Sequence, residues 1–133
     1  MRLCRFEQNG KAVAGFFLDD QVIPLSTAAY AAGETLEATD DLLSFLPHGS
    51  QHDTAQKMDE WLAENESAAS SLAMEDALIL TPIPKPNKLL LLAGNYAKHI
   101  EEGGGRASER ARTFPYVFMK PPLTTLTHPG DPI

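Results

Sequence analysis

The chain has 133 residues, a length typical of one domain or of two very small ones, and its net charge is −7. A nucleic-acid-binding protein needs a surplus of basic groups to displace counterions from phosphates, so we expect no nucleic-acid partner. The apolar run at residues 89–94 is too short to cross a bilayer. Because no secretory apolar segment follows residues 1–5 and Cys4 is the single cysteine, we expect a cytoplasmic protein with no membrane partner.

The N-terminal residues predict three strands. Residues 2–6 and 11–18 are rich in strand-favouring side chains, and Asn9-Gly10 between them is the strongest short signal for a β-hairpin. Residues 21–25 predict a third strand at the edge of a sheet, because they contain a proline, which cannot donate to a strand ladder. We expect Cys4 to be a small side chain within the first strand, since no base stands beside it.

Two short helices are expected after these strands. Ser26 is a candidate cap for an alanine-rich helix that Gly33 would close. Asp40 or Asp41 is a candidate cap for another short helix, which would run through Leu46 and stop at the following proline.

Residues 50–66 carry the clearest helical pattern. Ser50 opens a segment that resembles a capping box, and one apolar face of the helix holds Ala55, Met58, Trp61 and Leu62. The other face is acidic and ends in a Glu-x-Glu pair, Glu64 and Glu66, which we interpret as solvated. His48 and His52 have a metal-ligand spacing, but the proline and glycine around His48 argue against one continuous helix through both.

A change in composition predicts a domain boundary near residue 81. Residues 1–80 hold four basic and fourteen acidic groups, whereas residues 81–133 hold seven basic and four acidic groups and eight of the ten prolines. The segment 82–86 alternates proline with other residues and therefore predicts a stiff connector. We accordingly expect a small acidic domain at 1–80, closed by a strand at 77–80, and a second domain from 81 to 133.

The second region predicts two strands around a helical turn. Residues 88–93 are expected to form a strand buried on both faces, because their apolar run does not alternate. A helical turn from about 96 to 102 is ended by three glycines at 103–105, and residues 116–119 predict a further strand. The predicted fold class is α+β: an N-terminal β-meander with helices, followed by the first strands of a β-rich domain.

His99 and Glu102 are the strongest candidates for chemistry. In a helical turn they lie three residues apart on one face, where the carboxylate can orient the imidazole as a general base. The alternative is a surface helix that carries a solvated histidine and two solvated glutamates, and for such a pair taken alone this alternative is the commoner one.

The wider pattern of residues 88–133 resembles the start of the catalytic domain in the fumarylacetoacetate hydrolase family. The resemblance consists of six elements in the family's order: a proline-rich lead-in, a buried strand, an Asn-Tyr-x-x-His-x-x-Glu segment, a variable loop, a Pro-x-x-Phe-x-Lys-Pro segment and a Gly-x-Pro-Ile turn. In this sequence they are residues 82–86, 89–92, 95–102, 103–114, 115–121 and 130–133. For residues 1–80 the resemblance is one of layout only.

The resemblance implies a hydrolase that cleaves a carbon–carbon bond in a small anionic 1,3-diketo acid with the aid of Mg²⁺ or Mn²⁺, or Ca²⁺. By matching positions His99 would be the base and Glu102 its orienting partner, and Tyr96 and Lys120 would contact substrate. For Lys120 a surface position at a strand end is an equally good interpretation. The resemblance also implies a homodimer, and it makes residues 101–113 part of a lid over the substrate.

The sequence departs from the family pattern at two points. Gly94 stands where many members have an arginine before the Asn-Tyr pair. The family's metal ligands follow the Pro-Ile turn, so we expect no metal ligand in this chain, Asp131 included, and expect the chain to be the N-terminal part of a longer enzyme. The alternatives are a non-catalytic binding or dimerisation module, and a related hydratase, decarboxylase or isomerase.

Overall fold

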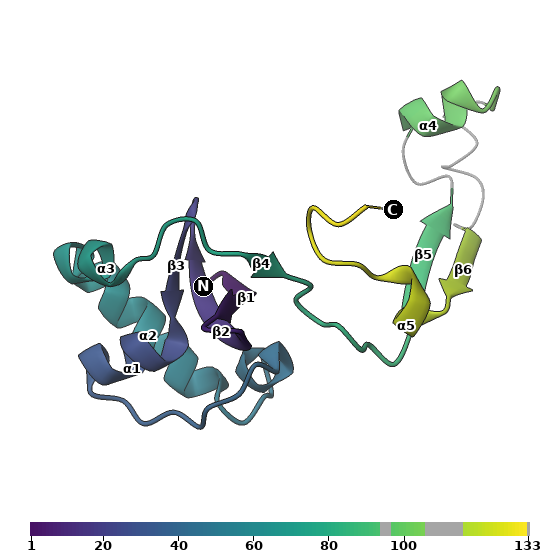
Figure 1. Cartoon of the computed structure of the whole chain (residues 1–133). Helices are drawn as coiled ribbons and strands as arrows, with labels where there is room; N and C mark the ends of the chain where they lie inside the picture. The colour runs from purple at the N-terminus through teal and green to yellow at the C-terminus, as the bar shows by residue number, and fades with distance from the viewer. Residues whose placement is uncertain (94–96, 106–115, 133) are drawn as a thin grey trace. The chain divides into compact units, whose positions relative to one another are not determined.

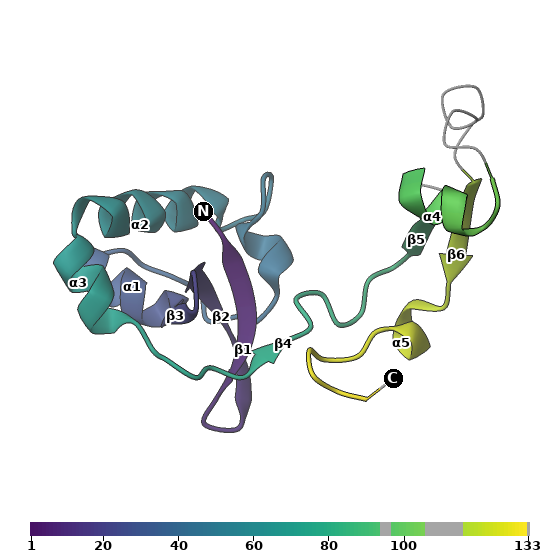
Figure 2. The ribbon, with the colours of Figure 1, turned by 90° about the horizontal axis from the view of Figure 1, so that it is seen from above.

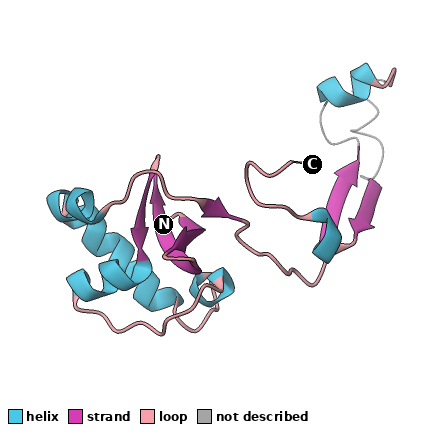
Figure 3. Ribbon diagram, in the orientation of Figure 1, coloured by secondary structure: helices cyan, strands magenta, loops and turns pink. Residues whose placement is uncertain are grey.

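The structure, a computed structural model, describes residues 1–93, 97–105 and 116–132. It confirms a mixed α+β protein with antiparallel sheets (Figures 1 and 3). The chain forms two compact units: unit 1 comprises residues 1–83 and 127–132, and unit 2 lies within residues 84–126. Among the helices of the described segments, none has the length and apolar character that crossing a membrane requires.

Unit 1 is built on a four-stranded antiparallel sheet of order β3-β2-β1-β4. Its strands are β1 (Leu3–Gln8), β2 (Lys11–Leu18), β3 (Gln21–Pro24) and β4 (Ile79–Leu80). The predicted hairpin is confirmed: Asn9 and Gly10 both have positive φ, 53° and 72°, as the tight turn between β1 and β2 requires. The predicted edge position of β3, with Pro24 at its end, is also confirmed.

Four helical segments follow or cover this sheet: α1 (Leu25–Ala32), the 3₁₀ helix η1 (Leu42–Phe45), α2 (His52–Glu64) and α3 (Glu66–Leu72). Two predicted caps are wrong. Ser26 lies inside α1, whose N-cap is Pro24, and α2 begins at His52 after Gln51 and not at Ser50. Gly33 does close α1 in the left-handed conformation, and the Asp41 side chain accepts from the backbone of Leu43 at the start of η1.

The core of unit 1 covers both faces of its sheet. On one face Phe16 and Ile23, both fully buried, pack with α1 and α2 through Leu25 and Met58. Figure 2 shows α1 and α2 together beside the sheet. On the other face Cys4, Phe6 and Val22 pack beneath the returning segment that contains Met74, Ala77 and Ile79. Alternation along the strands thus fills two separate apolar layers, because successive side chains point to opposite faces.

In its described residues, unit 2 contains a single strand pair. Its elements are β5 (Leu89–Ala93), α4 (Ala97–Glu102), β6 (Tyr116–Lys120) and α5 (Pro122–Thr125), and β5 pairs with β6 antiparallel. The predicted burial of residues 88–93 on both faces is wrong: Leu90 is 59% exposed and Leu92 is 50% exposed. Burial on two faces requires a layer on each side of a strand, and within the described residues β5 has only β6 as a sheet neighbour.

Candidate functional site

The predicted catalytic pair belongs to α4 of unit 2. The helix ends where expected, because the backbone amides of Gly104 and Gly105 donate to the carbonyls of Glu101 and Ile100 (3.0 and 2.9 Å) and Gly104 has a φ of 78°. Glu102 is exposed at the last position of the helix. The backbone of His99 is helical, but its side chain lies outside the described part of the chain, as does the whole of Tyr96.

The hairpin register separates Lys120 from the start of the His-Glu segment. Ala93, where β5 ends and the chain continues toward α4, is opposite Tyr116, whereas Lys120 is opposite Leu89 at the other end of the hairpin. Four residue steps along a strand span roughly 13 Å. Lys120 is therefore exposed at the end of the hairpin that is distant from this connection, and the strand pairing does not bring it beside the segment that contains Glu102.

The predicted lid lies largely outside the described residues, since residues 106–115 are not described. Its arginines Arg106, Arg110 and Arg112 belong to that part. Lys98 and Lys120, two basic residues in the described part of unit 2, are exposed, and only Lys98 belongs to α4. Exposed cations attract an anionic substrate over a distance set by salt screening, which is a general electrostatic effect and not a binding geometry.

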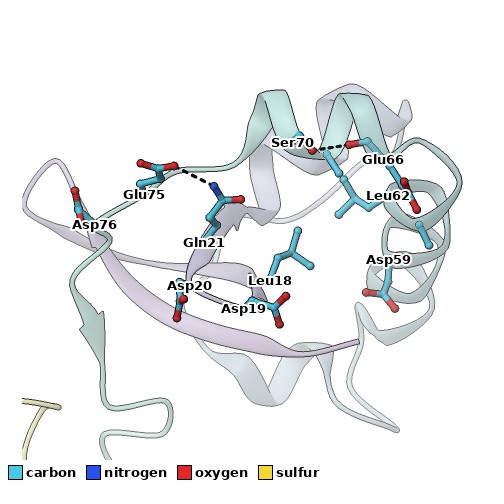
Figure 4. Close-up of a pocket in the computed structure, with 12 residues that line it drawn as sticks. Leu18, Asp19, Asp20, Gln21, Asp59, Leu62, Glu66, Ser70, Glu75 and Asp76 are labelled. Atoms are coloured by element: carbon cyan, nitrogen blue, oxygen red, sulfur yellow. Dashed lines mark hydrogen bonds between the residues drawn. The ribbon is translucent and has the colours of Figure 1, made fainter.

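Unit 1 contains a pocket of about 930 Å³ with a strongly acidic lining (Figure 4). The β2–β3 turn, α2, α3 and the segment after α3 all contribute to it. Six carboxylates line it: Asp19, Asp20, Asp59, Glu66, Glu75 and Asp76. Such a lining attracts cations and repels an anionic keto acid. The pocket is therefore not a site for the substrate that the sequence predicts.

Several pocket residues already have partners in the fold. Gln21 Nε2 donates to Glu75 Oε1 (3.3 Å), and the hydroxyl of Ser70 donates to the carbonyl of Glu66 (2.9 Å), as Figure 4 shows. The N-terminal ammonium of Met1 lies 3.0 Å from Asp59 Oδ2. Sequence reasoning did not find this pocket, because its acids come from separate segments whose proximity is set by tertiary packing. The paired acids at 19–20 and 75–76 were the available signal.

His52 and Cys4, two other candidates from the sequence, have structural roles. The ring of His52 donates through Nδ1 to the carbonyl of Phe45 (3.0 Å), which ties α2 to the end of η1. His48 lies in a turn with a φ of 73° and not on α2, so the predicted absence of one helix through both histidines is confirmed. Cys4 is buried in β1, and burial raises the pKa of its thiol from 9.0 to about 11, which keeps the thiol protonated and unreactive at neutral pH.

The described residues do not fit the divalent ion that the resemblance implies. Among them, no three His, Cys, Asp or Glu side chains form a group that can hold a metal ion. Glu64 and Glu66 are exposed at the junction of α2 and α3. Within the described segments the donor set therefore identifies no group of metal ligands.

No protein-family profile matches the chain, and no curated protein sequence matches it.

Proposed function

We propose that residues 81–133 begin the catalytic domain of a hydrolase that cleaves a carbon–carbon bond in 1,3-diketo acids. The observation that supports the proposal is the order of elements: a strand, a helix that carries His99 and Glu102, three glycines, a second strand and the Gly130-Asp131-Pro132 turn. β5, α4 and β6 follow one another in the order of the six sequence elements that resemble the fumarylacetoacetate hydrolase family. The resemblance also implies a homodimer.

In the proposed reaction His99 is the general base. It takes a proton from water, and the resulting hydroxide adds to the carbonyl carbon remote from the substrate carboxylate. The carbon–carbon bond then breaks, so that the water oxygen ends in a new carboxylic acid and the electron pair leaves with the enolate of a keto acid, which is protonated. Glu102 would orient the imidazole and favour its protonated form. Tyr96 and Lys120 enter the proposal as substrate contacts.

A divalent ion, where bound, would polarise the keto-acid oxygens as a Lewis acid. By resemblance its ligands follow the Pro-Ile turn in sequence, so the chemistry assigned to this chain is limited to the base and its positioning partner. A hydratase, decarboxylase or isomerase would use the same substrate class, and fold resemblance does not choose among these reactions.

The test is an activity screen of the full-length protein that contains these residues. Acylpyruvates, fumarylpyruvate, oxaloacetate and hydroxymuconate-type acids would be supplied with Mg²⁺ or Mn²⁺, and products identified by mass. Formation of two acids from an acylpyruvate supports the proposal. Turnover of oxaloacetate alone would instead indicate a decarboxylase, and no turnover of any of these acids would overturn the proposal.

A second candidate is a non-catalytic dimerisation module. It is favoured by one observation, the exposed apolar face of the β5–β6 hairpin formed by Leu90, Leu92, Val117 and Met119. Size-exclusion chromatography with light scattering distinguishes the two: a defined dimer with no keto-acid turnover in the full-length protein supports the module.

A further inference from the structure

The two places where the chain passes between unit 1 and unit 2 are joined by hydrogen bonds inside unit 1. The chain leaves unit 1 after Ile83 and returns to it at Thr127. Thr81 lies just before the departure point, and its backbone N–H donates to Nδ1 of His128 (2.9 Å). The hydroxyl of Thr81 donates to the carbonyl of Thr127 (2.8 Å). Thr81, which precedes unit 2 in the sequence, is thus hydrogen-bonded to two residues that follow unit 2, Thr127 and His128.

A compact turn presents His128 to Thr81. Asp131 Oδ2 accepts from the hydroxyl of Thr127 (3.0 Å) and from the backbone N–H of His128 (3.2 Å). The backbone N–H of Asp131 donates back to the carbonyl of His128 (3.2 Å), and Gly130 supplies the positive φ of 86° within the turn. We call Thr81, Thr127, His128 and Asp131 the clasp. Its bonds set the direction in which the imidazole is held.

The Thr81 bond requires one protonation state of His128. A backbone N–H can only donate, so Nδ1 must accept with its lone pair, which leaves the ring proton on Nε2. A protonated imidazole carries hydrogen on both nitrogens and would face the Thr81 amide donor against donor. Nδ1–H of the protonated ring can donate to the Thr81 hydroxyl oxygen, 3.1 Å from Nδ1, but the Thr81 amide is still left without its acceptor.

Loss of the Nδ1 acceptor is costly because the Thr81 amide is buried. Thr81 is only 8% exposed, so water does not readily replace the lost acceptor, whereas His128 is exposed and exchanges protons with solvent. The other titratable group that the described contacts bring to the clasp is Asp131. The Asp131→Asn variant described below separates the effect of this carboxylate from that of the imidazole.

We propose that the hydrogen bonds of the clasp hold together the two segments that connect unit 1 to unit 2, and that they do so only while His128 is neutral. With neutral His128 the segments around Thr81 and Thr127 are held side by side. Protonation of His128 removes the Thr81 amide bond and allows the two connecting segments to move independently. The proposal does not depend on the catalytic function proposed above.

The test is amide hydrogen exchange of the 133-residue chain followed by NMR. We expect the protection factor of the Thr81 amide to fall about tenfold between about pH 7.5 and pH 5.5 in the wild-type chain. His128→Asn keeps a side-chain acceptor close to the position of Nδ1 but does not titrate, so its Thr81 protection should be independent of pH. In His128→Ala protection should be low at both pH values.

Two controls locate the effect. Asp131→Asn removes the carboxylate charge and should keep the pH dependence of the Thr81 amide, and His48→Asn changes an exposed histidine outside the clasp and should also keep it. Equal protection at both pH values in the wild-type chain would overturn the proposal. So would the same fall in His128→Asn, or a Thr81 amide that is unprotected at about pH 7.5.

Discussion

Leu90 is opposite Met119 across the β5–β6 pair, and the two residues are 59% and 70% exposed. Leu92 and Val117 form the next such pair on the same face, because alternate residues of a strand point to the same side. Four neighbouring aliphatic side chains on a two-stranded sheet make an apolar surface that soluble domains ordinarily cover.

We therefore expect the 133-residue chain to associate through this face. Leu90→Lys should reduce both the binding of a hydrophobic dye and the apparent mass in light scattering at high protein concentration, because it places a charge at the centre of the apolar surface. Tyr30→Lys is the matched control, since Tyr30 is 91% exposed but belongs to α1 of unit 1. A monomeric wild-type chain that binds no dye would contradict the expectation.

Phe16 tests the packing of the sheet against the helices. Phe16 belongs to β2 and is fully buried against the α1–α2 layer. Phe16→Ala should therefore lower the free energy of unfolding by about 3–5 kcal/mol, because it removes buried apolar surface and leaves a cavity. Urea unfolding followed by Trp61 fluorescence measures the change. Tyr30→Ala should alter stability by less than about 0.5 kcal/mol, and an equal loss in both variants would show that Phe16 is not a core residue.

Gly15 tests how closely Phe6 and Val22 pack in the second apolar layer, on the face of the sheet that does not contain Phe16. A Cβ at this position would lie 2.7 Å from Val22 Cγ1, 2.8 Å from Phe6 Cε1 and 3.0 Å from the carbonyl oxygen of Ile23. Gly15→Ala should therefore destabilise unit 1 by about 1–3 kcal/mol. This loss would exceed the small gain that alanine gives by lowering the conformational entropy of the unfolded chain. A variant as stable as wild type in urea unfolding would show that Phe6 and Val22 move apart at little cost.

Because the Cys4 thiol is buried, we expect the free energy of unfolding to fall at alkaline pH. Its thiol has a pKa of about 11 in the folded chain against 9.0 when exposed, so the unfolded chain loses its proton first as the pH rises. The contribution is fully present below about pH 9 and is lost toward pH 11, with about 2 kcal/mol lost by pH 10.5. The measurement is the difference in unfolding free energy between wild type and Cys4→Ala at several pH values. A difference that does not change with pH would mean that the thiol titrates alike in both states.

His99 tests the proposed chemistry in the full-length protein. His99→Ala should lower kcat by roughly 10²- to 10⁴-fold, the usual contribution of a positioned general base, with a much smaller effect on KM. His48→Asn removes an exposed histidine from unit 1 and should leave kcat unchanged. If His99→Ala retained near-normal kcat on the substrate found in the screen, His99 would be a surface residue of α4.

Local signals predicted much of unit 1. Asn9-Gly10 located the hairpin because a two-residue turn needs positive φ at both positions, and Gly33 located the end of α1 for a similar reason. The helix caps at Ser26 and Ser50 were wrong because serine is only a permitted cap, and packing decides where the helix begins. α3 and α5 were missed, since neither has a strong apolar period of its own.

The features that sequence did not predict depend on contacts between distant segments. The exposure of Leu90 and Leu92 follows from the number of strands that flank β5, which the apolar run itself does not encode. The acidic pocket likewise needs the β2–β3 turn, α2 and the segment after α3 to meet. The His99–Glu102 pair was predicted from spacing and resemblance, and its backbone setting in a helix agrees with that spacing.

The pairing of β1 with β4 affects how unit 1 is completed during synthesis on the ribosome. In this pairing Arg5 is opposite Leu80, and Phe6 is opposite Ile79. During synthesis β2 follows β1 directly and can pair with it at once. β4, in contrast, emerges only after all the helices of this unit have been made. Until then one edge of β1 has unsatisfied backbone groups, and Phe6 lacks part of its cover from Ile79. The nascent chain therefore passes through a stage with an open sheet edge, at which pairing with another chain competes with the arrival of β4.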